Sequence, residues 1–160
     1  MFSRTVVSNL KLVNEHVTTD ELNKALDTAN LEKTISELPK GFETEIGEKG
    51  ATLSGGQKQR LAIARGLLQN APINVFDDSL SALDTQTDFE IRQKLKSERK
   101  NTTTIIITHR VATAKDADKI IVFDEGKIQA IGTHDDLMKI DGLYKRIYEI
   151  QTGLFVKELE

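Results

Sequence analysis

Apolar residues recur at helical spacing in the first half of the chain. The first such stretch runs from residue 18 to residue 37, with Thr19 or Asp20 as a candidate amino-terminal cap. Pro39 ends the pattern, and residues 41–52 are rich in glycine and glutamate, which favours a loop. The pattern therefore predicts one long helix followed by an irregular segment.

Three further stretches carry the same spacing. Residues 57–69 have an apolar face, with Gly66 as a weak point in the helix. Residues 85–98 form a polar stretch whose expected apolar contacts are Phe89, Ile91 and Leu95. Residues 135–150 are again helical in pattern.

Strand patterns dominate the second half. Residues 73–76 and 102–108 are short apolar or β-branched runs, and residues 120–123 and 128–131 flank a turn and predict a hairpin. Helices come first and then alternate with strands, which predicts an α/β fold. We expect a helical subdomain over residues 1–70, followed over residues 71–160 by part of a parallel sheet with terminal helices. Because the runs lack strict alternation, their strands should be covered on both faces.

The composition of the chain excludes some classes of function but does not by itself indicate one. The 160 residues carry a net charge of -3, which gives no reason to expect a nucleic-acid partner. There is no cysteine, so disulfides and thiol chemistry are excluded. No apolar run approaches the roughly 20 residues of a membrane-spanning helix, so a membrane role would come through a partner or through sequence outside this chain.

The segment Leu53-Ser54-Gly55-Gly56-Gln57 leads directly into the second predicted helix. Ser54 is a candidate cap, and the two glycines allow a ligand to approach the backbone closely. A helix that begins here directs its free N–H groups and positive dipole end at the ligand, as a phosphate site requires. A capped helix after a glycine turn explains these five residues equally well.

The longer stretch LSGGQKQRLAIARGLL, residues 53–68, resembles the signature motif and following helix of ATP-binding-cassette (ABC) proteins. The resemblance implies a P-loop NTPase-like ABC ATPase of the exporter type. It also implies that Ser54, Gly55, Gly56 and Gln57 contact the ATP bound to a second cassette in a head-to-tail dimer. On this basis we expect ATP and Mg²⁺ as ligands.

Residues 73–78 resemble the family's Walker B strand. A strand that ends in an acid is where α/β folds place ligand chemistry. By resemblance, Asp77 holds the Mg²⁺ of Mg-ATP, mainly through water, and Asp78 is the catalytic position. The family normally has glutamate where this chain has Asp78, and Asn74 also departs from the usual apolar strand.

Residues 79–84 resemble the D-loop, which communicates between two nucleotide sites and here includes Asp84. His109 follows the strand pattern of residues 102–108. A lone histidine at a strand end is more often structural than catalytic, but the order and spacing resemble the switch histidine that contacts the γ-phosphate. Residues 120–128 resemble the family's post-switch hairpin, and residues 132–137 and 142–144 resemble the carboxyl-terminal end of exporter cassettes. Residues 2–10 resemble the segment after the Q-loop.

The sequence contains no Gly-x-x-x-x-Gly-Lys-Ser/Thr, the loop that wraps ATP phosphates. We therefore expect a carboxyl-terminal fragment of a cassette, inactive alone, with an incomplete core and exposed apolar surface that favours association.

Aspartate is one methylene shorter than glutamate, which misplaces the carboxylate at position 78 by about 1 Å, enough to cost on the order of 100-fold in rate. Our hypothesis is therefore the weak-site half of a heterodimeric exporter, with an intact signature. The alternative is a homodimer in which Asp78 suffices. The expected partners are a second nucleotide-binding domain and a transmembrane domain, and the expected location is the cytoplasmic face of the cell membrane.

Three other functions compete with this interpretation. The chain could be a non-catalytic regulatory module that docks on a partner cassette through the signature helix. A DNA-repair or chromosome-organising ATPase shares the signature, but no heptad pattern for its coiled coils occurs here. A translation-type cassette is a further alternative, although the GTHDDL and GLYKRIYEIQ segments favour exporters.

Overall fold

The computed structural model describes residues 4–47, 53–77, 79–80, 82–98 and 101–154. The chain separates into two compact units, residues 1–107 and 108–160, which we describe individually. The expected boundary after residue 70, between a helical subdomain and part of a parallel sheet, is a different division of the chain and stays a prediction.

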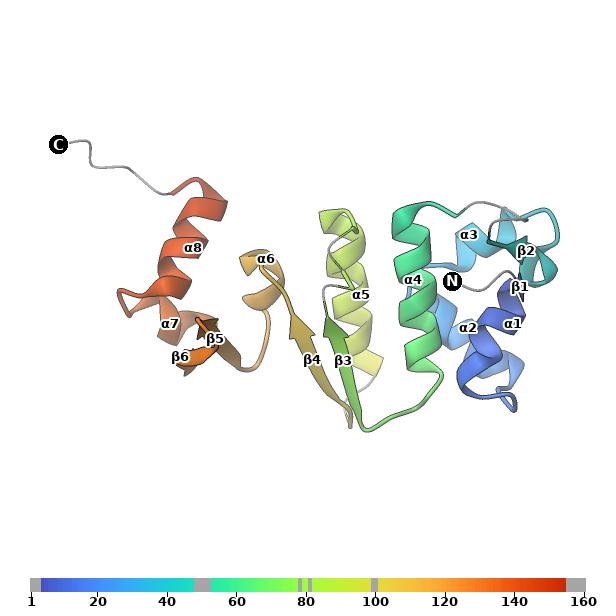
Figure 1. The fold of residues 1–160 in the computed structure, drawn as a ribbon, viewed down its shortest axis with the longest axis horizontal. Coiled ribbons are helices and arrows are strands. Elements are labelled where there is room, and N and C mark those ends of the chain that lie inside the picture. Colours follow the sequence, from blue (N-terminus) through green and yellow to red (C-terminus); the bar gives the residue numbers. More distant parts are fainter. Residues whose placement is uncertain (1–3, 48–52, 78, 81, 99–100, 155–160) are drawn as a thin grey trace. The chain divides into compact units, whose positions relative to one another are not determined.

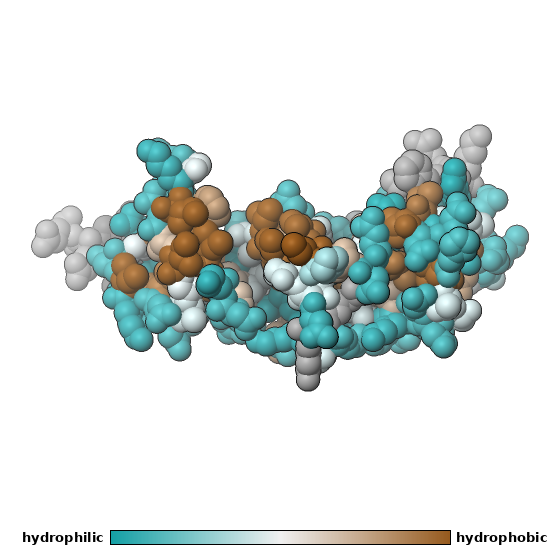
Figure 2. Space-filling view, turned by 90° about the horizontal axis from the view of Figure 1, so that it is seen from below, coloured by the Kyte–Doolittle hydropathy of each residue, from teal (hydrophilic) through white to brown (hydrophobic). Residues whose placement is uncertain are grey.

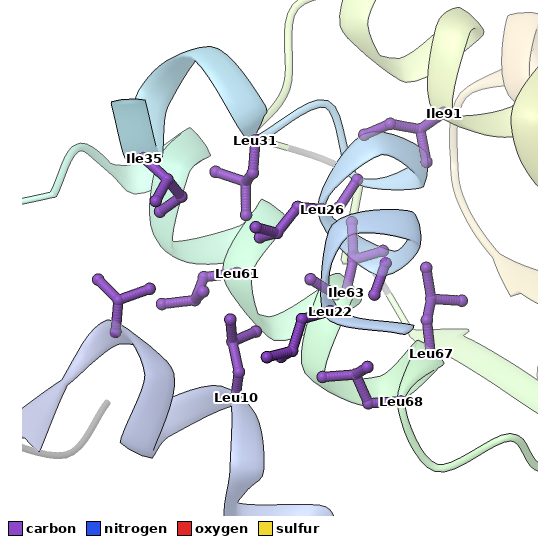
Figure 3. Packing of buried hydrophobic residues seen from close by; sticks show 14 of the residues in the cluster. Leu10, Leu22, Leu26, Leu31, Ile35, Leu61, Ile63, Leu67, Leu68 and Ile91 are labelled. Carbon is purple, nitrogen blue, oxygen red and sulfur yellow. The ribbon is translucent and has the colours of Figure 1, made fainter. Parts of the chain in front are cut away.

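The first unit is mainly helical (Figure 1). Its helices are α1 (Val6–Leu10), α2 (Thr19–Thr28), α3 (Glu32–Ser36), α4 (Gly55–Leu67) and α5 (Thr85–Glu98), with 3₁₀ turns η1 (Lys11–Val13) and η2 (Gly41–Glu43). Leucine and isoleucine side chains from α1, α2, α4 and α5 meet in one core, which includes Leu10, Leu26, Leu61 and Ile91 (Figure 3). The buried residues of α4 run from Leu61 to Leu67, so this core holds the middle and the carboxyl half of the helix.

The single helix predicted over residues 18–37 is wrong, because α2 ends at Thr28 and α3 begins at Glu32. Asn30 has a φ of 57°, and its N–H donates to the carbonyl of Asp27, while Leu31 N–H donates to the carbonyl of Leu26. These two bonds form a Schellman ending, and asparagine adopts its left-handed position more readily than most residues. The cap of α2 is Thr18, one residue before the predicted candidates.

Two small sheets belong to this unit. Strand β1 (Arg4–Thr5) pairs antiparallel with β2 (Glu45–Ile46), so residues 41–52 are not entirely loop. Strand β3 (Ile73–Asp77) pairs parallel with β4 (Thr103–Ile107), in a register that places Val75 opposite Ile105. The parallel pair, with α5 between its strands in sequence, confirms the α/β class.

Only one face of the β3–β4 pair is covered. Asn74 and Phe76 point into the core, where Phe76 belongs to the same cluster as Ile91 and Leu95 of α5. The opposite face is about half exposed and consists of Ile73, Val75, Ile105 and Ile107. Figure 2 shows hydrophobic residues gathered on the surface where β3 and β4 lie in Figure 1. Coverage on both faces was thus wrong for this chain, whereas the expected exposed apolar surface is confirmed.

Helix α5 matches its predicted bounds, but one of its three predicted apolar contacts is wrong. Ile91 and Leu95 are buried, whereas Phe89 is 44% exposed. The ring of Phe89 lies under the guanidinium group of Arg92, 5.8 Å from ring centroid to Cζ. A cation above an aromatic face stabilises the ring at the surface, so helical spacing alone misassigned it to the core.

The second unit has its own core around Val111, Val122, Leu137 and Tyr144. Its elements are α6 (Val111–Ala114), β5 (Ile120–Asp124), β6 (Lys127–Gly132), α7 (His134–Met138) and α8 (Leu143–Thr152). The predicted hairpin is confirmed, and its two turn residues both have positive φ, 47° at Glu125 and 73° at Gly126. The helix predicted over residues 135–150 is instead two helices, since Gly142 is extended between them. Among the described residues, no helix has the length and apolar character needed to cross a membrane.

Candidate functional site

The amino end of α4 is closed by a reciprocal cap. Ser54 Oγ accepts a hydrogen bond from the Gln57 backbone N–H at 3.2 Å, and Gln57 Oε1 accepts from the Ser54 N–H at 2.8 Å. Ser54 is therefore the helix cap, as predicted, and α4 begins two residues earlier than the periodicity indicated. The cap uses the carboxamide oxygen of Gln57, so the donor NH₂ group is the part of this side chain that can face a ligand.

Gly55 and Gly56 occupy the first turn of α4, although glycine weakens a helix relative to alanine. A side chain at Gly55 would meet nothing within 4 Å, and one at Gly56 would meet Ala82 O at 3.4 Å, an ordinary contact. Neither glycine has the positive φ that favours this residue. Among the described residues, internal packing therefore does not require glycine at either position, and the small residues leave the backbone open to close approach.

The first turn of α4 has free backbone N–H donors and no acidic side chain to pair with them. The first N–H groups of a helix lack intrahelical acceptors, and Ser54 Oγ and Ser54 O accept from residues 57 and 58. This leaves the N–H groups of Gly55 and Gly56 without an acceptor inside the helix. The first turn contains no acidic residue. The donors and the helix dipole together favour an anion.

Residues 82–84 lie directly against this end of α4. The Ala82 N–H donates to Gln59 Oε1 at 3.1 Å, and Leu83 Cδ2 lies 3.6 Å from the position of a Cβ on Gly56. Leu80 and Leu83 are buried in the core and anchor the segment on both sides of Ala82. The structure thus brings the signature residues together with the segment that resembles the D-loop.

Asp84 is the amino-terminal cap of α5. Its Oδ1 accepts from the Thr87 N–H at 2.9 Å and its Oδ2 from the Thr87 hydroxyl at 2.7 Å. The backbone and side-chain hydrogen bonds from Thr87 hold the pKa of Asp84 below its usual value. The carboxylate therefore fixes the start of α5, and its expected part in nucleotide binding stays a prediction.

Asp77 is the last residue of β3 and is exposed. Its carbonyl accepts a hydrogen bond from Ser79 Oγ at 3.2 Å, and its register partner is Ile107, two residues before His109. The catalytic position Asp78 lies outside the described residues. Within the described ranges no three acidic or histidine side chains gather into a metal site. A single carboxylate still suits Mg²⁺ that arrives with nucleotide, because phosphates and water supply its other ligands.

His109 belongs to the second unit and is exposed. Gln151 of α8 holds the backbone around it: its Nε2 donates to the His109 carbonyl at 2.7 Å, and its Oε1 accepts from the Val111 N–H at 2.9 Å. Sequence reasoning missed both Gln151 and Gln59. Their partners lie 42 and 23 residues away, so no local pattern could have identified them.

Comparison with known proteins places these features in a family context. The sequence model described as "ABC transporter" matches residues 2–81. An ATP-dependent lipid A-core flippase of Desulfotalea psychrophila is 42% identical over 151 residues, which cover 94% of this chain and 26% of that protein. A probable multidrug resistance ABC transporter ATP-binding/permease protein, YheI of Bacillus subtilis, is 45% identical over 158 residues, 99% of this chain and 27% of that protein.

Structural comparison agrees with the sequence comparison. A bacterial Atm1-family ABC exporter with ATP bound matches with a TM-score of 0.89 and 40% identity, over 94% of this chain and 27% of that chain. The chain thus spans about a quarter of the length of the relatives that it matches. The likeness extends over nearly all of its residues, including both compact units.

Proposed function

The chain belongs to the ABC transporter family, and from this premise we propose that it is part of an ATP-hydrolysing domain that powers export across a membrane. The amino end of helix α4 contacts ATP that is bound mainly by a second cassette. The observation that carries the proposal is the pair of glycines in the first turn of α4, which no close contact among the described residues requires. The names of the relatives, a lipid flippase and a multidrug transporter, support export over other uses of this fold.

At this end of α4 the chain binds and orients phosphate. The N–H groups of Gly55 and Gly56 donate to phosphate oxygens, and the Ser54 hydroxyl, which accepts from Gln57, is left with its own proton to donate. The dipole of the 13-residue helix adds positive potential at the same point. Fixed donors of this kind stabilise charge that develops during phosphoryl transfer.

The chain's own nucleotide site would use the carboxyl end of β3. Asp77 would hold Mg²⁺, which neutralises phosphate charge when it arrives with ATP. By resemblance, Asp78 polarises the attacking water and His109 contacts the γ-phosphate. The chain contains no P-loop sequence, so these residues alone do not retain ATP.

Two partners follow from this proposal. One is a second nucleotide-binding domain, arranged head to tail so that each signature faces the other domain's nucleotide. The other is a transmembrane domain of the same transporter, which would place this chain at the cytoplasmic face of the cell membrane. The curated relatives, about four times as long as this chain, leave room for such a domain.

A matched pair of glycine substitutions in the full-length transporter tests the proposal. Gly55 and Gly66 both lie in α4, and an added Cβ meets nothing within 4 Å at either position. Gly55→Ala should lower ATPase turnover at least about tenfold, because a methyl group separates donors from phosphate. Gly66→Ala should leave turnover unchanged and raise stability by up to about 1 kcal/mol. Equal turnover in both variants would contradict the proposal.

The finer proposal is that this chain comes from the weak-site half of a heterodimer. It rests on Asp78, whose carboxylate is one methylene short of the family's usual glutamate. Asp78→Glu in the complete heterodimer should raise turnover at this site, measured with the other site inactivated. If Asp78 already suffices in a homodimer, the substitution will give no increase.

A second candidate function is a non-catalytic regulatory module that docks on a partner cassette. The absence of a P-loop sequence favours it for the chain alone. Calorimetry with Mg-ATP on the 160-residue chain, with Asp77→Ala as control, addresses this point. No binding agrees with both candidates, whereas tight binding that Asp77→Ala abolishes would mean that a nucleotide site forms without the loop.

A further inference from the structure

Gln59 lies on α4 two residues after Gln57, the last signature residue, and its side chain reaches a different segment. Its Oε1 accepts the Ala82 N–H at 3.1 Å, across 23 residues of sequence. On one side of this bond is the phosphate-facing turn of α4, and on the other is the loop that leads from β3 into α5. The bond is thus a polar link between the first turns of α4 and residues 82–84, which have separate roles in the proposed function.

Apolar packing beside the bond limits how these segments can move. Leu80 is 5% exposed and Leu83 4%, and both belong to the core that contains α4. Leu83 also lies near Gly56, 3.6 Å from a Cβ built there. The leucines hold the loop against the helix, but packing is not directional, so it does not fix the orientation of the peptide at Ala82. The hydrogen bond supplies that orientation.

The loop continues directly into α5 through the cap at Asp84, whose carboxylate accepts two bonds from Thr87. A shift of the Ala82 peptide therefore displaces residues that are fixed at both ends, by α4 on one side and by α5 on the other.

From these contacts we propose that Gln59 is a positioning residue: it fixes the loop at Ala82 to the signature helix, so that phosphate bound at Gly55 and Gly56 sets the position of residues 82–84. The inference rests on the proposed function. Gln59 itself touches no phosphate in this account, because its side-chain oxygen is directed at the loop. Its effect on hydrolysis is indirect: Gln59 positions Ala82, and residues 82–84 in turn border the phosphate site at the amino end of α4.

Three variants separate this role from simple stability. Gln59→Leu removes the acceptor, Gln59→Glu keeps an oxygen acceptor at the same position, and Gln69→Leu is the matched control at an exposed glutamine just beyond α4. In the 160-residue chain, Gln59→Leu should speed hydrogen exchange of the Ala82 amide about fivefold, the effect of one lost hydrogen bond. Gln59→Glu and Gln69→Leu should not.

In the full-length transporter, Gln59→Leu should lower kcat for ATP hydrolysis at least about threefold, while KM for ATP changes less than about twofold, because positioning and not ATP binding is lost. Gln59→Glu should recover kcat in part, since it keeps the acceptor for Ala82 but adds a negative charge near the phosphate site. Unchanged kcat in Gln59→Leu beside an active wild type, or an equal loss in Gln69→Leu, would overturn the inference and leave the proposed function standing. An inactive wild type would overturn both, while the exchange data would still report the bond itself.

Discussion

Lys94 Nζ lies 2.7 Å from both the carboxylate Oδ1 and the backbone carbonyl oxygen of Asp27, and so joins α5 to the carboxyl end of α2. A cation at this end of a helix also complements the helix dipole. We predict that Lys94→Met lowers the free energy of unfolding by about 1 kcal/mol. Chemical denaturation measures the change, and Lys33→Met is the control, since the Lys33–Glu37 pair is fully at the surface. A larger loss in the control would contradict the assignment.

Asn74 is a buried polar residue in an otherwise apolar part of β3. It is 8% exposed, and its Nδ2 has no hydrogen-bond partner among the described residues. Burying an amide without a partner is costly, and a leucine of similar size removes that cost. Asn74→Leu should raise the free energy of unfolding by about 1 kcal/mol. Thermal or denaturant unfolding measures it, and a clear loss of stability would mean that the amide has a structural role.

The cap at Asp84 makes the start of α5 sensitive to acid. The Thr87 backbone N–H, and then its hydroxyl, lower the pKa of Asp84 in the folded chain. A lowered folded pKa means that this contribution to stability is present above the unfolded pKa and is lost as pH falls through the folded value. An NMR titration should find the carboxyl of Asp84 below its usual pKa. Thr87→Val should raise that pKa part of the way back, because the backbone N–H remains.

The uncovered face of the β3–β4 pair should make the isolated chain associate. Val75 and Ile105 are register partners, 58% and 46% exposed, at the centre of that face. Contiguous apolar surface of this kind favours self-association or aggregation. Sedimentation velocity should show concentration-dependent association that the double variant Val75→Thr, Ile105→Thr reduces. Threonine keeps the β-branched shape, so the fold should persist. Identical sedimentation of both proteins would contradict this prediction.

Features fixed by a few neighbouring residues could be predicted from the sequence. The cap at Ser54 and the hairpin turn at Glu125 and Gly126 depend on local backbone chemistry, and both appear in the structure. The parallel pairing of β3 with β4 followed from their order with a helix between them.

Features that depend on competition between local and distant contacts could not be predicted. The break at Asn30 interrupts apolar spacing that continues through Leu31, because the Schellman bonds outweigh the helical pattern there. Phe89 fits the apolar spacing of α5 yet lies at the surface with Arg92. The links through Gln59 and Gln151 are tertiary, and neither residue stands out by type or spacing.

The central claim is that the amino end of α4 contacts the phosphates of ATP held by a second cassette. The 160 residues contain no cysteine, so Ser54→Cys introduces the single thiol of this chain at the amino end of α4. An ATP analogue with a thiol-reactive group on its γ-phosphate should label the peptide that contains residue 54 in the assembled transporter, and excess ATP should block the labelling. Thr18→Cys, at the equivalent cap of α2, should show no labelling that ATP blocks. Labelling of residue 54 that ATP does not block, or equal labelling at residue 18, would contradict the account.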